Sequence, residues 1–284
     1  MNHLVDLHLH TTASDGRLSP EQLVALVVSR GLRIIAVTDH DTTDGLPVAL
    51  EAARAHPHLK LISGVELSTD VPGGEIHVLG YFVDRGNAEF ESFLAQMRDS
   101  RVGRGRRMVE KLAALGMPVP WERVLELAKG GSVGRPHVAQ AMVEQGHVIS
   151  IKEAFDKYIG RNGPAYAERE KLTPVEAVRF LRRTGALPVI AHPGEVDNLD
   201  AVLPELKQAG MVGMEVHYNN YPPEKMERLA RMAAAHGLLP CGGTDYHALG
   251  QEGETEPGNA GPPMEVAERL MEMARPSVEG RARR

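Results

Sequence analysis

The chain has 284 residues, of which 42% are hydrophobic and 25% are charged, and its net charge is −6. This composition is typical of a globular protein with a substantial core, and the negative charge argues against a surface broadly coated for nucleic-acid binding. The single cysteine, Cys241, leaves no intramolecular disulfide and favours a reducing compartment. Because neither a secretory signal nor a membrane-spanning stretch is recognisable, we expect a cytoplasmic protein with no membrane partner.

Seven short apolar segments are predicted to be β-strands, and amphipathic helical patterns follow several of them. Two of these helices have clear starts, at Ser19 before Pro20 and at Thr173, where Glu176 completes a capping box. Near-continuous apolar strands that alternate with helices indicate a parallel sheet covered on both faces. Seven such strands favour a closed or nearly closed α/β barrel. The predicted strands are residues 4–10, 33–38, 60–65, 76–83, 187–191, 212–217 and 238–242.

The strand pattern stops between about residues 87 and 169, where only helical patterns occur. We therefore expect a helical insertion domain at residues 96–165, covering the active site of a discontinuous barrel at residues 1–95 and 166–284. The predicted helices of the insertion are residues 98–111, 121–129, 136–145 and 151–158.

Nine possible metal ligands stand beside the predicted strands. His8 and His10 are two residues apart on a strand, so their side chains point to the same face. Glu66 follows the third strand, where a carboxylate can bridge two cations. Most of the nine lie at carboxyl ends of strands, where barrel enzymes build their active sites. The positions of His8, His10 and His77 within their strands leave their height in the barrel open. The full set is His8, His10, Asp15, His40, Glu66, His77, His192, Asp245 and His247.

A single histidine beside a strand is more often a core or surface residue than a metal ligand. Nine imidazoles and carboxylates spread over six strand ends are a different matter, and they indicate a multinuclear metallohydrolase. A shell that mixes histidine with carboxylate suits Zn²⁺, Mn²⁺ or Fe²⁺ better than Mg²⁺ or Ca²⁺.

Six short motifs resemble those of the PHP-domain phosphoesterases, a family named for polymerase and histidinol phosphatase. They are HLHTTASDG, VTDHDTTDG, GVELST, EIHVLGY, AHPG and GGTDYH. The similarity is greatest to the bacterial branch of nucleoside 3′,5′-bisphosphate phosphatases and 5′-to-3′ exoribonucleases. The resemblance implies a distorted seven-stranded (β/α) barrel that holds two or three divalent metal ions, with Mn²⁺ favoured over Fe²⁺ or Zn²⁺.

The resemblance also implies three ligand sets and an activity. The sets are His8, His10, Glu66 and Asp245 for one metal; Glu66, His77 and His192 for a second; and Asp15, His40 and His247 for a third. The implied reaction removes the 3′-phosphate of nucleoside 3′,5′-bisphosphates and trims short single-stranded RNA with a 5′-phosphate. We predict direct attack on phosphorus by metal-bound hydroxide without a protein nucleophile, because the chain has no P-loop, Gly-x-Ser-x-Gly or nucleophilic cysteine motif.

Four residues are predicted to contact the substrate. Arg135 and His137 begin an insertion helix, where free backbone N–H groups and an arginine favour phosphate. Arg17 follows the turn that carries Asp15. His217 is two residues from Glu215 on the sixth strand, so we expect both to face the pocket, with Glu215 supporting a metal ligand. A surface or core role is the alternative for each of them.

Several other features have two interpretations. The basic run at residues 98–111 carries six basic and two acidic residues, and it is either a solvated helix face or a guide for an RNA backbone. No aromatic residue within it offers base stacking. Asp39 and Asp41 flank His40 and either orient it or form turns, and Cys241 is interpreted as a small packing residue.

Three alternative functions remain open on the sequence. A histidinol-phosphate phosphatase shares the metal scaffold, although the long insertion favours a nucleotide substrate. A non-catalytic PHP module would have lost ligands, and none is missing here. An amidohydrolase with two metals commonly uses a carboxylated lysine at a strand end, and no predicted strand ends in lysine. The sequence does not indicate the oligomeric state.

Overall fold

A computed structural model describes residues 3–71, 74–168, 172–196, 198–218, 221–250 and 254–274. Seven strands follow one another in chain order around a single sheet. The first and last strands meet: the backbone N–H of Asp245 donates to the His8 carbonyl at 2.9 Å, and that of His10 to the Tyr246 carbonyl at 3.0 Å. The predicted nearly closed barrel is therefore confirmed. The strands are β1 Val5–Leu9, β2 Ile34–Val37, β3 Lys60–Val71, β4 Gly74–Tyr81, β5 Leu187–Ile190, β6 Gly213–Tyr218 and β7 Leu239–Gly243.

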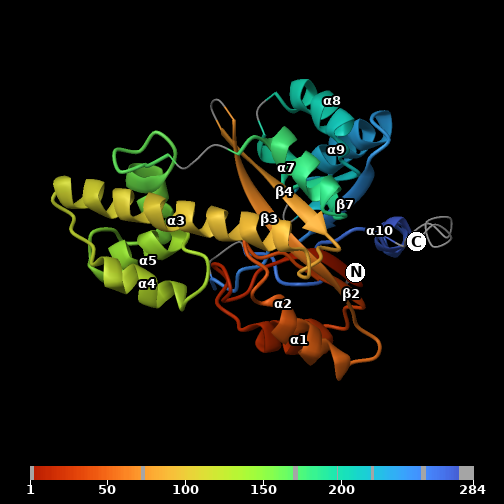
Figure 1. Cartoon of the computed structure of the whole chain (residues 1–284), viewed down its shortest axis with the longest axis horizontal. Helices are drawn as coiled ribbons and strands as arrows, with labels where there is room; N and C mark the ends of the chain where they lie inside the picture. Colours follow the sequence, from red (N-terminus) through yellow and green to blue (C-terminus); the bar gives the residue numbers. More distant parts are fainter. Residues whose placement is uncertain are drawn as a thin grey trace.

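The expectation of a fully parallel sheet is wrong at one strand. β4 runs antiparallel to both of its neighbours, β3 and β5, whereas the other neighbouring strands pair in parallel. β3 continues to Val71, beyond the predicted end at residue 65, and forms a long hairpin with β4 (Figure 1). An apolar strand pattern does not encode direction, which is why the sequence could not predict this reversal. As a result, the first half of β4 lies at the end of the barrel where the parallel strands finish.

In the part of the chain that the structure describes, six helices pack around the barrel, as Figure 1 illustrates. The two predicted helix starts are confirmed, since Ser19 and Thr173 each accept a hydrogen bond from the third helical residue in a capping box. Cys241, in β7, is fully buried among apolar residues, which agrees with its predicted packing role. The helices are α1 Pro20–Ser29, α2 Leu46–Arg54, α7 Pro174–Arg183, α8 Leu199–Ala209, α9 Pro223–Ala235 and α10 Met264–Ala274.

The described part of the segment between β4 and α7 contains only helices, and most of these lie to one side of the barrel (Figure 1). The long helix α3 links the two parts. Its first half places Phe90 and Leu94 in the barrel core, and its second half places Met108 and Leu112 in a separate core. The predicted boundary at residue 96 falls inside α3. The helices are α3 Ala88–Ala114, α4 Trp121–Ala128, α5 Arg135–Glu144 and α6 Ile151–Ala154, followed by a π-helical turn at Phe155–Ile159.

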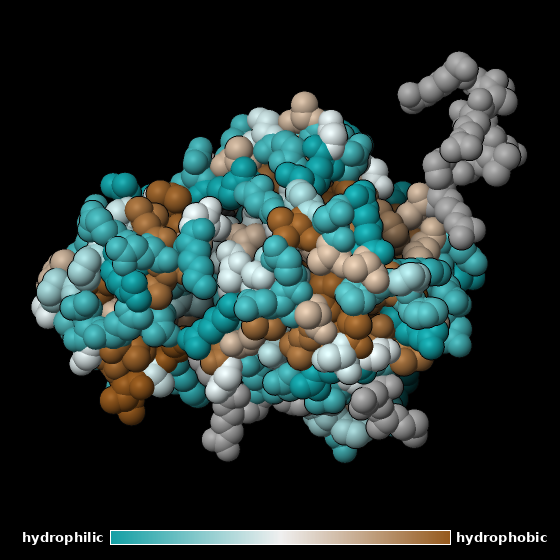
Figure 2. Space-filling view, turned by 90° about the horizontal axis from the view of Figure 1, so that it is seen from below, coloured by the Kyte–Doolittle hydropathy of each residue, from teal (hydrophilic) through white to brown (hydrophobic). Residues whose placement is uncertain are grey.

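No helix in the described part of the chain is long and apolar enough to cross a lipid bilayer. The face seen in Figure 2 is largely hydrophilic, with hydrophobic side chains scattered among the polar ones.

Candidate metal centre

Glu66 is the centre of a histidine cluster at one end of the barrel. Its side chain is buried, with 1% exposed, and both carboxylate oxygens contact imidazole nitrogens. Oε1 lies 2.8 Å from His77 and 3.1 Å from His192. Oε2 lies 3.2 Å from His8, 3.2 Å from His10 and 3.1 Å from His40. Five predicted ligands thus meet on one predicted carboxylate.

Strand direction explains how His77 reaches this cluster. His77 is near the start of β4, opposite Ser68 of β3, two residues beyond Glu66. In a parallel strand this early position would put the imidazole at the wrong end of the barrel. Because β4 is antiparallel, His77 lies beside Glu66 instead.

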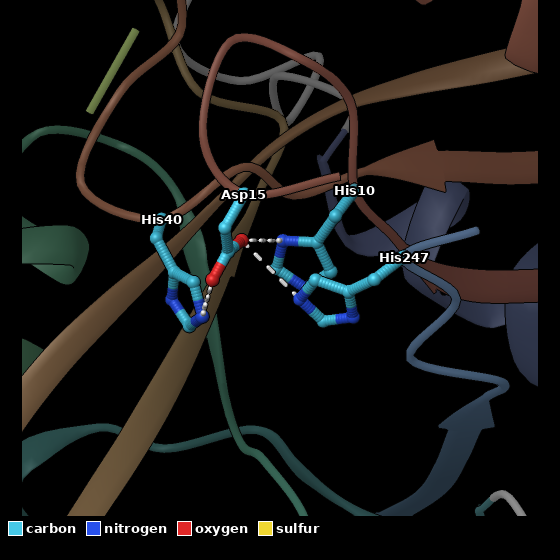
Figure 3. Close-up of side chains that lie close together, drawn as sticks. All are labelled: His10, Asp15, His40 and His247. Atoms are coloured by element: carbon cyan, nitrogen blue, oxygen red, sulfur yellow. Dashed lines mark ion pairs between the residues drawn. The ribbon is translucent and has the colours of Figure 1, made fainter. Parts of the chain in front are cut away.

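Asp15 returns to the cluster through a tight loop after β1. A Cβ atom on the next residue, Gly16, would lie 2.7 Å from the backbone of His10, so this close approach requires glycine. Asp15 Oδ1 is 3.2 Å from His247 and 3.8 Å from His10, and Oδ2 is 3.8 Å from His40 (Figure 3). His40 lies on one side of the carboxylate, and His10 and His247 lie on the other.

Two ligand positions have unusual backbone conformations. His192 follows β5 with φ 32°, and Asp245 follows β7 with φ 53°. Non-glycine residues rarely adopt positive φ, and such conformations persist where the surrounding structure enforces them. Both turns direct the side chains of His192 and Asp245 back over the end of the barrel where the cluster lies.

Three groups of ligand atoms are close enough to share a cation. In each group all the atoms lie within 4.8 Å of one another. The first group is the set implied for one metal by the family resemblance. The second adds His10 to the implied set of Asp15, His40 and His247. The third contains His40 where the resemblance implies His192, whose imidazole lies 3.1 Å from Glu66. The groups are His8, His10, Glu66 and Asp245; His10, Asp15, His40 and His247; and His40, Glu66 and His77.

The donor atoms fit divalent metal ions. Four of them are buried without a hydrogen-bond partner among the described residues, although each lies near an opposite charge: His10 Nε2, His40 Nδ1, Asp15 Oδ1 and Asp245 Oδ1. A buried polar atom without a partner is costly. These atoms converge on one another but are not aligned for hydrogen bonds, and a cation placed between them would satisfy them. The cluster is therefore able to hold metal ions.

The electrostatics of the cluster distinguish His192 and His247 from His40. Burial alone would lower the pKa of each of these three imidazoles, but Glu66 and Asp245 raise the pKa of His192 to about 9, and Asp15 and Asp245 raise that of His247 to about 10. At His40 burial wins: with the positive charges of His10 and Arg101 nearby, it lowers the pKa to about 3. At neutral pH a cation must therefore displace protons from His192 and His247 but none from His40.

Two residues support the ligands from behind. Glu215 is fully buried, accepts from His8 Nδ1 at 3.1 Å and accepts from the His192 backbone N–H at 2.7 Å. The Tyr218 hydroxyl donates to Asp245 Oδ2 at 2.7 Å, which leaves Oδ1 facing the cluster. The supporting role predicted for Glu215 agrees with this geometry, whereas Tyr218 was not predicted.

The structure does not bring His217 to the cluster, which corrects the expectation that it faces the pocket. The register of β6 against β7 shifts between Glu215 and His217, so the simple alternation of faces breaks down. Tyr218 takes the inward place. None of the described contacts of His217 involves a cluster residue. A one-residue irregularity of this kind has no signal in a single sequence.

The contacts described for Asp39 and Asp41 hold neighbouring segments of the chain in place. Asp39 accepts from the Thr11 backbone N–H at 2.7 Å and from the Ser14 hydroxyl at 2.6 Å, fixing the loop that carries Asp15. Asp41 accepts from the Ser68 backbone N–H at 3.0 Å and from Arg101 Nε at 2.5 Å.

A small cavity of about 100 Å³ opens beside the cluster and is lined by three arginines. Arg135 was predicted, and Arg101 and Arg104 come from the basic run of α3. Arg135 and Arg104 both contact the Glu75 carboxylate, at 2.5 and 3.0 Å. His40 and His77 line the same cavity. The three-residue spacing of Arg101 and Arg104 places them on one helix face, but Arg98 and Arg107 continue the same spacing, so the sequence alone does not select these two.

His137 and Arg17 lie at a second, larger cavity of about 410 Å³, which Asp15 also lines. His137 is buried, and its Nδ1 accepts from the Gly134 backbone N–H at 2.9 Å, so it caps the start of α5. Arg17 donates to the Gln140 side chain at 3.0 Å and to the Leu249 carbonyl at 3.2 Å.

A nearly closed barrel with histidines and carboxylates gathered at one end defines a metal-dependent barrel hydrolase. The chain belongs to the PHP domain family, whose model matches residues 6–158. The relative named 5′-3′ exoribonuclease Rnm of Salmonella typhimurium is 37% identical over 249 residues, covering 86% of this chain and 85% of the relative. The relative named 3′,5′-nucleoside bisphosphate phosphatase of Chromobacterium violaceum is 30% identical, covering 88% of this chain and 89% of the relative.

A solved structure described as a metal-dependent phosphoesterase of Bifidobacterium adolescentis superposes with a TM-score of 0.87 at 29% identity. The match covers 97% of this chain and 98% of that one. The likeness therefore extends over the helices beside the barrel as well as the barrel itself.

Proposed function

We propose that the protein is a metal-dependent phosphoesterase that removes the 3′-phosphate of nucleoside 3′,5′-bisphosphates and trims short single-stranded RNA carrying a 5′-phosphate. The observation that carries this proposal is the arginine-lined cavity next to the Glu66 cluster. A substrate with two phosphates needs two adjacent anion sites, and the protein offers one made of arginines and one made of metal ligands. The similarity to the exoribonuclease and the bisphosphate phosphatase points to the same substrates.

The nine predicted ligands hold two or three divalent cations in this proposal, with Mn²⁺ favoured. Such cations supply a nucleophile at neutral pH by lowering the pKa of water, and they stabilise the charge that develops on phosphoryl oxygens. Glu215 and Tyr218 hold His8 and Asp245 in the orientation that this requires.

Arg101, Arg104 and Arg135 bind the 5′-phosphate, because guanidinium groups pair with phosphate oxygens through charge-assisted hydrogen bonds. The substrate phosphate competes with Glu75 for Arg104 and Arg135. With the 5′-phosphate fixed there, the 3′-phosphate lies over the cluster. Water adds across the P–O3′ bond: its oxygen joins phosphorus, and a proton goes to the departing 3′ oxygen.

The helical segment at residues 96–165 acts in this proposal as a unit that covers the site, since α3 and α5 supply all three arginines. The barrel at residues 1–95 and 166–284 supplies all nine metal ligands. The expected cytoplasmic location stays a prediction from the sequence.

The test is phosphate release from adenosine 3′,5′-bisphosphate by Mn²⁺-loaded protein, with His192→Ala as the control. We expect rapid release that the substitution abolishes, and slower release from adenosine 3′-monophosphate, which lacks the group for the arginines. No release from protein shown by elemental analysis to contain its metal would refute the proposal.

Two other functions fit less well. Histidinol phosphate carries a cationic amine, which three arginines beside the cluster would repel, so we expect it to be a poor substrate. An amidohydrolase with a carboxylated lysine has no counterpart, because none of the seven described strands ends in lysine.

A further inference from the structure

The larger cavity has no occupant assigned to it in the proposed function. It measures about 410 Å³ and lies between the loop after β1 and helices α4 to α6. A Cβ atom on Gly131 would lie 2.5 Å from the Ala13 carbonyl, so the α4–α5 loop packs directly on the loop that carries Asp15. The Ser132 backbone N–H donates to the same carbonyl at 2.8 Å. These contacts fix the barrel loop against the helices, so the cavity between them is defined by the fold.

The two cavities meet at the cluster. Asp15 and Pro136 line both of them, and the start of α5 separates them. The arginine-lined cavity includes His40, on one side of the Asp15 carboxylate. Arg17 and Leu249, close in sequence to Asp15 and His247, line the larger cavity. His10 and His247 lie on the side of Asp15 away from His40 (Figure 3). A substrate that crosses the cluster from the arginines would therefore enter the larger cavity.

The larger cavity combines apolar walls with cations and hydrogen-bonding groups. Leu127, Ile151 and Leu249 provide apolar surface, and Gln140 provides an amide. Arg17 and Lys129 bring positive charge. The acid Glu144 is already paired with Arg123 at 2.7 Å, which lowers the pKa of its carboxyl and offsets its charge. This mixture suits a nucleoside followed by a phosphate.

We propose that the larger cavity binds the nucleotide on the 3′ side of the scissile phosphate of 5′-phosphorylated RNA. The inference rests on the proposed function and adds a downstream subsite to it. Hydrolysis of such an RNA at the cluster breaks the same P–O3′ bond. The first nucleotide leaves with its 5′-phosphate and a protonated 3′ oxygen. The shortened RNA keeps the scissile phosphate as its new 5′ end. The cavity is thus the feature that makes the phosphatase an exoribonuclease.

The test compares adenosine 3′,5′-bisphosphate with 5′-phosphorylated diadenylate. Gln140→Trp fills the cavity, and we expect it to lower kcat/KM for the dinucleotide on the order of tenfold, the equivalent of about 1.4 kcal/mol. The bisphosphate should change less than about twofold, since its groups lie elsewhere. Lys129→Asn is a milder variant, because asparagine tolerates the φ of 49° at this position. It should flatten the salt dependence of RNA binding by about 0.7 for the one phosphate contact removed.

Lys152→Asn is the matched control, since Lys152 is exposed on α6, pairs with Asp156 and does not line the cavity. Equal losses on both substrates would overturn the inference by placing the cavity in the bisphosphate site. Unchanged dinucleotide hydrolysis in Gln140→Trp would overturn it as well. A wild-type protein inactive on the bisphosphate would refute the proposed function instead. Fluorescence anisotropy with a labelled 5′-phosphorylated triadenylate then tests the subsite by binding alone, with a weaker complex expected for Gln140→Trp than for Lys152→Asn.

Discussion

Five imidazoles contact a single buried carboxylate, Glu66. The orientation of two of these histidines, His8 and His192, is set by Glu215, which lies behind them. Glu215 contacts His8 through one oxygen and the backbone of His192 through the other. It therefore sets which nitrogen of His8 carries the proton and fixes the turn that carries His192. Groups that orient metal ligands in this way commonly affect metal affinity strongly.

We expect Glu215→Gln to weaken metal retention by about tenfold or more, because an amide cannot accept from both donors as a carboxylate does. The measurement is metal content by mass spectrometry after dialysis against graded chelator concentrations. Glu205→Gln, an exposed position on α8, is the control. Equal metal contents in the two variants would show that Glu215 has only a packing role.

The ionisation of the metal-free protein gives a prediction with a definite sign. His192 and His247 have folded-state pKa values of about 9 and 10, above the ordinary value of 6.5. Their stabilisation is complete below pH 6.5 and is lost as the pH rises through 9 to 10. The carboxyls of Asp15, Glu66 and Asp245 have lowered pKa values, so their contribution persists throughout this range.

We therefore expect the unfolding temperature of the protein in chelator to fall by about 5 °C or more between pH 6.5 and pH 10. Saturating Mn²⁺ should reduce or reverse the trend, because cation binding is favoured as the ligands lose protons. Differential scanning calorimetry provides the measurement, and His247→Gln should show a shallower decline. A metal-free protein that becomes more stable toward pH 10 would contradict the assignment.

At the scale of the elements, the sequence predicted where strands and helices occur better than how they are oriented. All seven strands were located, six of them to within two residues at each end, because runs of apolar residues report burial, whereas β3 extends six residues beyond its predicted end. The reversal of β4 was missed, since a strand of either direction has the same pattern. The nine predicted ligands were selected by residue type and position and lie together at one barrel end, but Tyr218 was missed because the bulge in β6 moves it inward. Contacts between distant segments such as Arg101 and Asp41 depend on packing that no local pattern contains.

We expect the arginines of helices α3 and α5 to make the protein prefer substrates that carry a 5′-phosphate. Arg135→Ala should lower kcat/KM for adenosine 3′,5′-bisphosphate by about tenfold to a hundredfold, the effect of losing a hydrogen bond to a charged group. Hydrolysis of adenosine 3′-monophosphate should change little, since that substrate has no 5′-phosphate. Steady-state kinetics on both substrates test this. Arg107→Ala is the control, because Arg107 lies one helical turn from Arg104 and outside the cavity. Parallel losses on the two substrates would assign Arg135 to the structure of α5 alone.

At the scale of the whole molecule, two cores share one helix. Gly105 of α3 packs tightly against Trp121 of the helical part, because a Cβ atom there would lie 3.0 Å from the Trp121 ring. We expect Gly105→Leu to destabilise the protein by about 1–3 kcal/mol through overpacking, despite the better helix propensity of leucine. Denaturant unfolding followed by Trp121 fluorescence, the single tryptophan, measures the change. Gly103→Leu is the control, since a Cβ atom there would meet only the flexible end of the Arg107 side chain, at 3.4 Å. A loss of similar size in both variants would attribute the effect to α3 in general.

The overlap among the three ligand groups has a thermodynamic consequence. His10 and His40 each belong to two groups, and Glu66 belongs to two as well. A cation bound in one group would orient the Glu66 carboxylate, which can bridge to a second cation, but it would also occupy an imidazole nitrogen that a second group shares and repel the second cation by its charge. The occupancies are linked by a coupling free energy, and each cation alters the affinity for the other by the same factor. Metal uptake by this protein should accordingly follow a cooperative isotherm rather than the sum of independent sites, and a substitution at a shared ligand should change the affinity of more than one site.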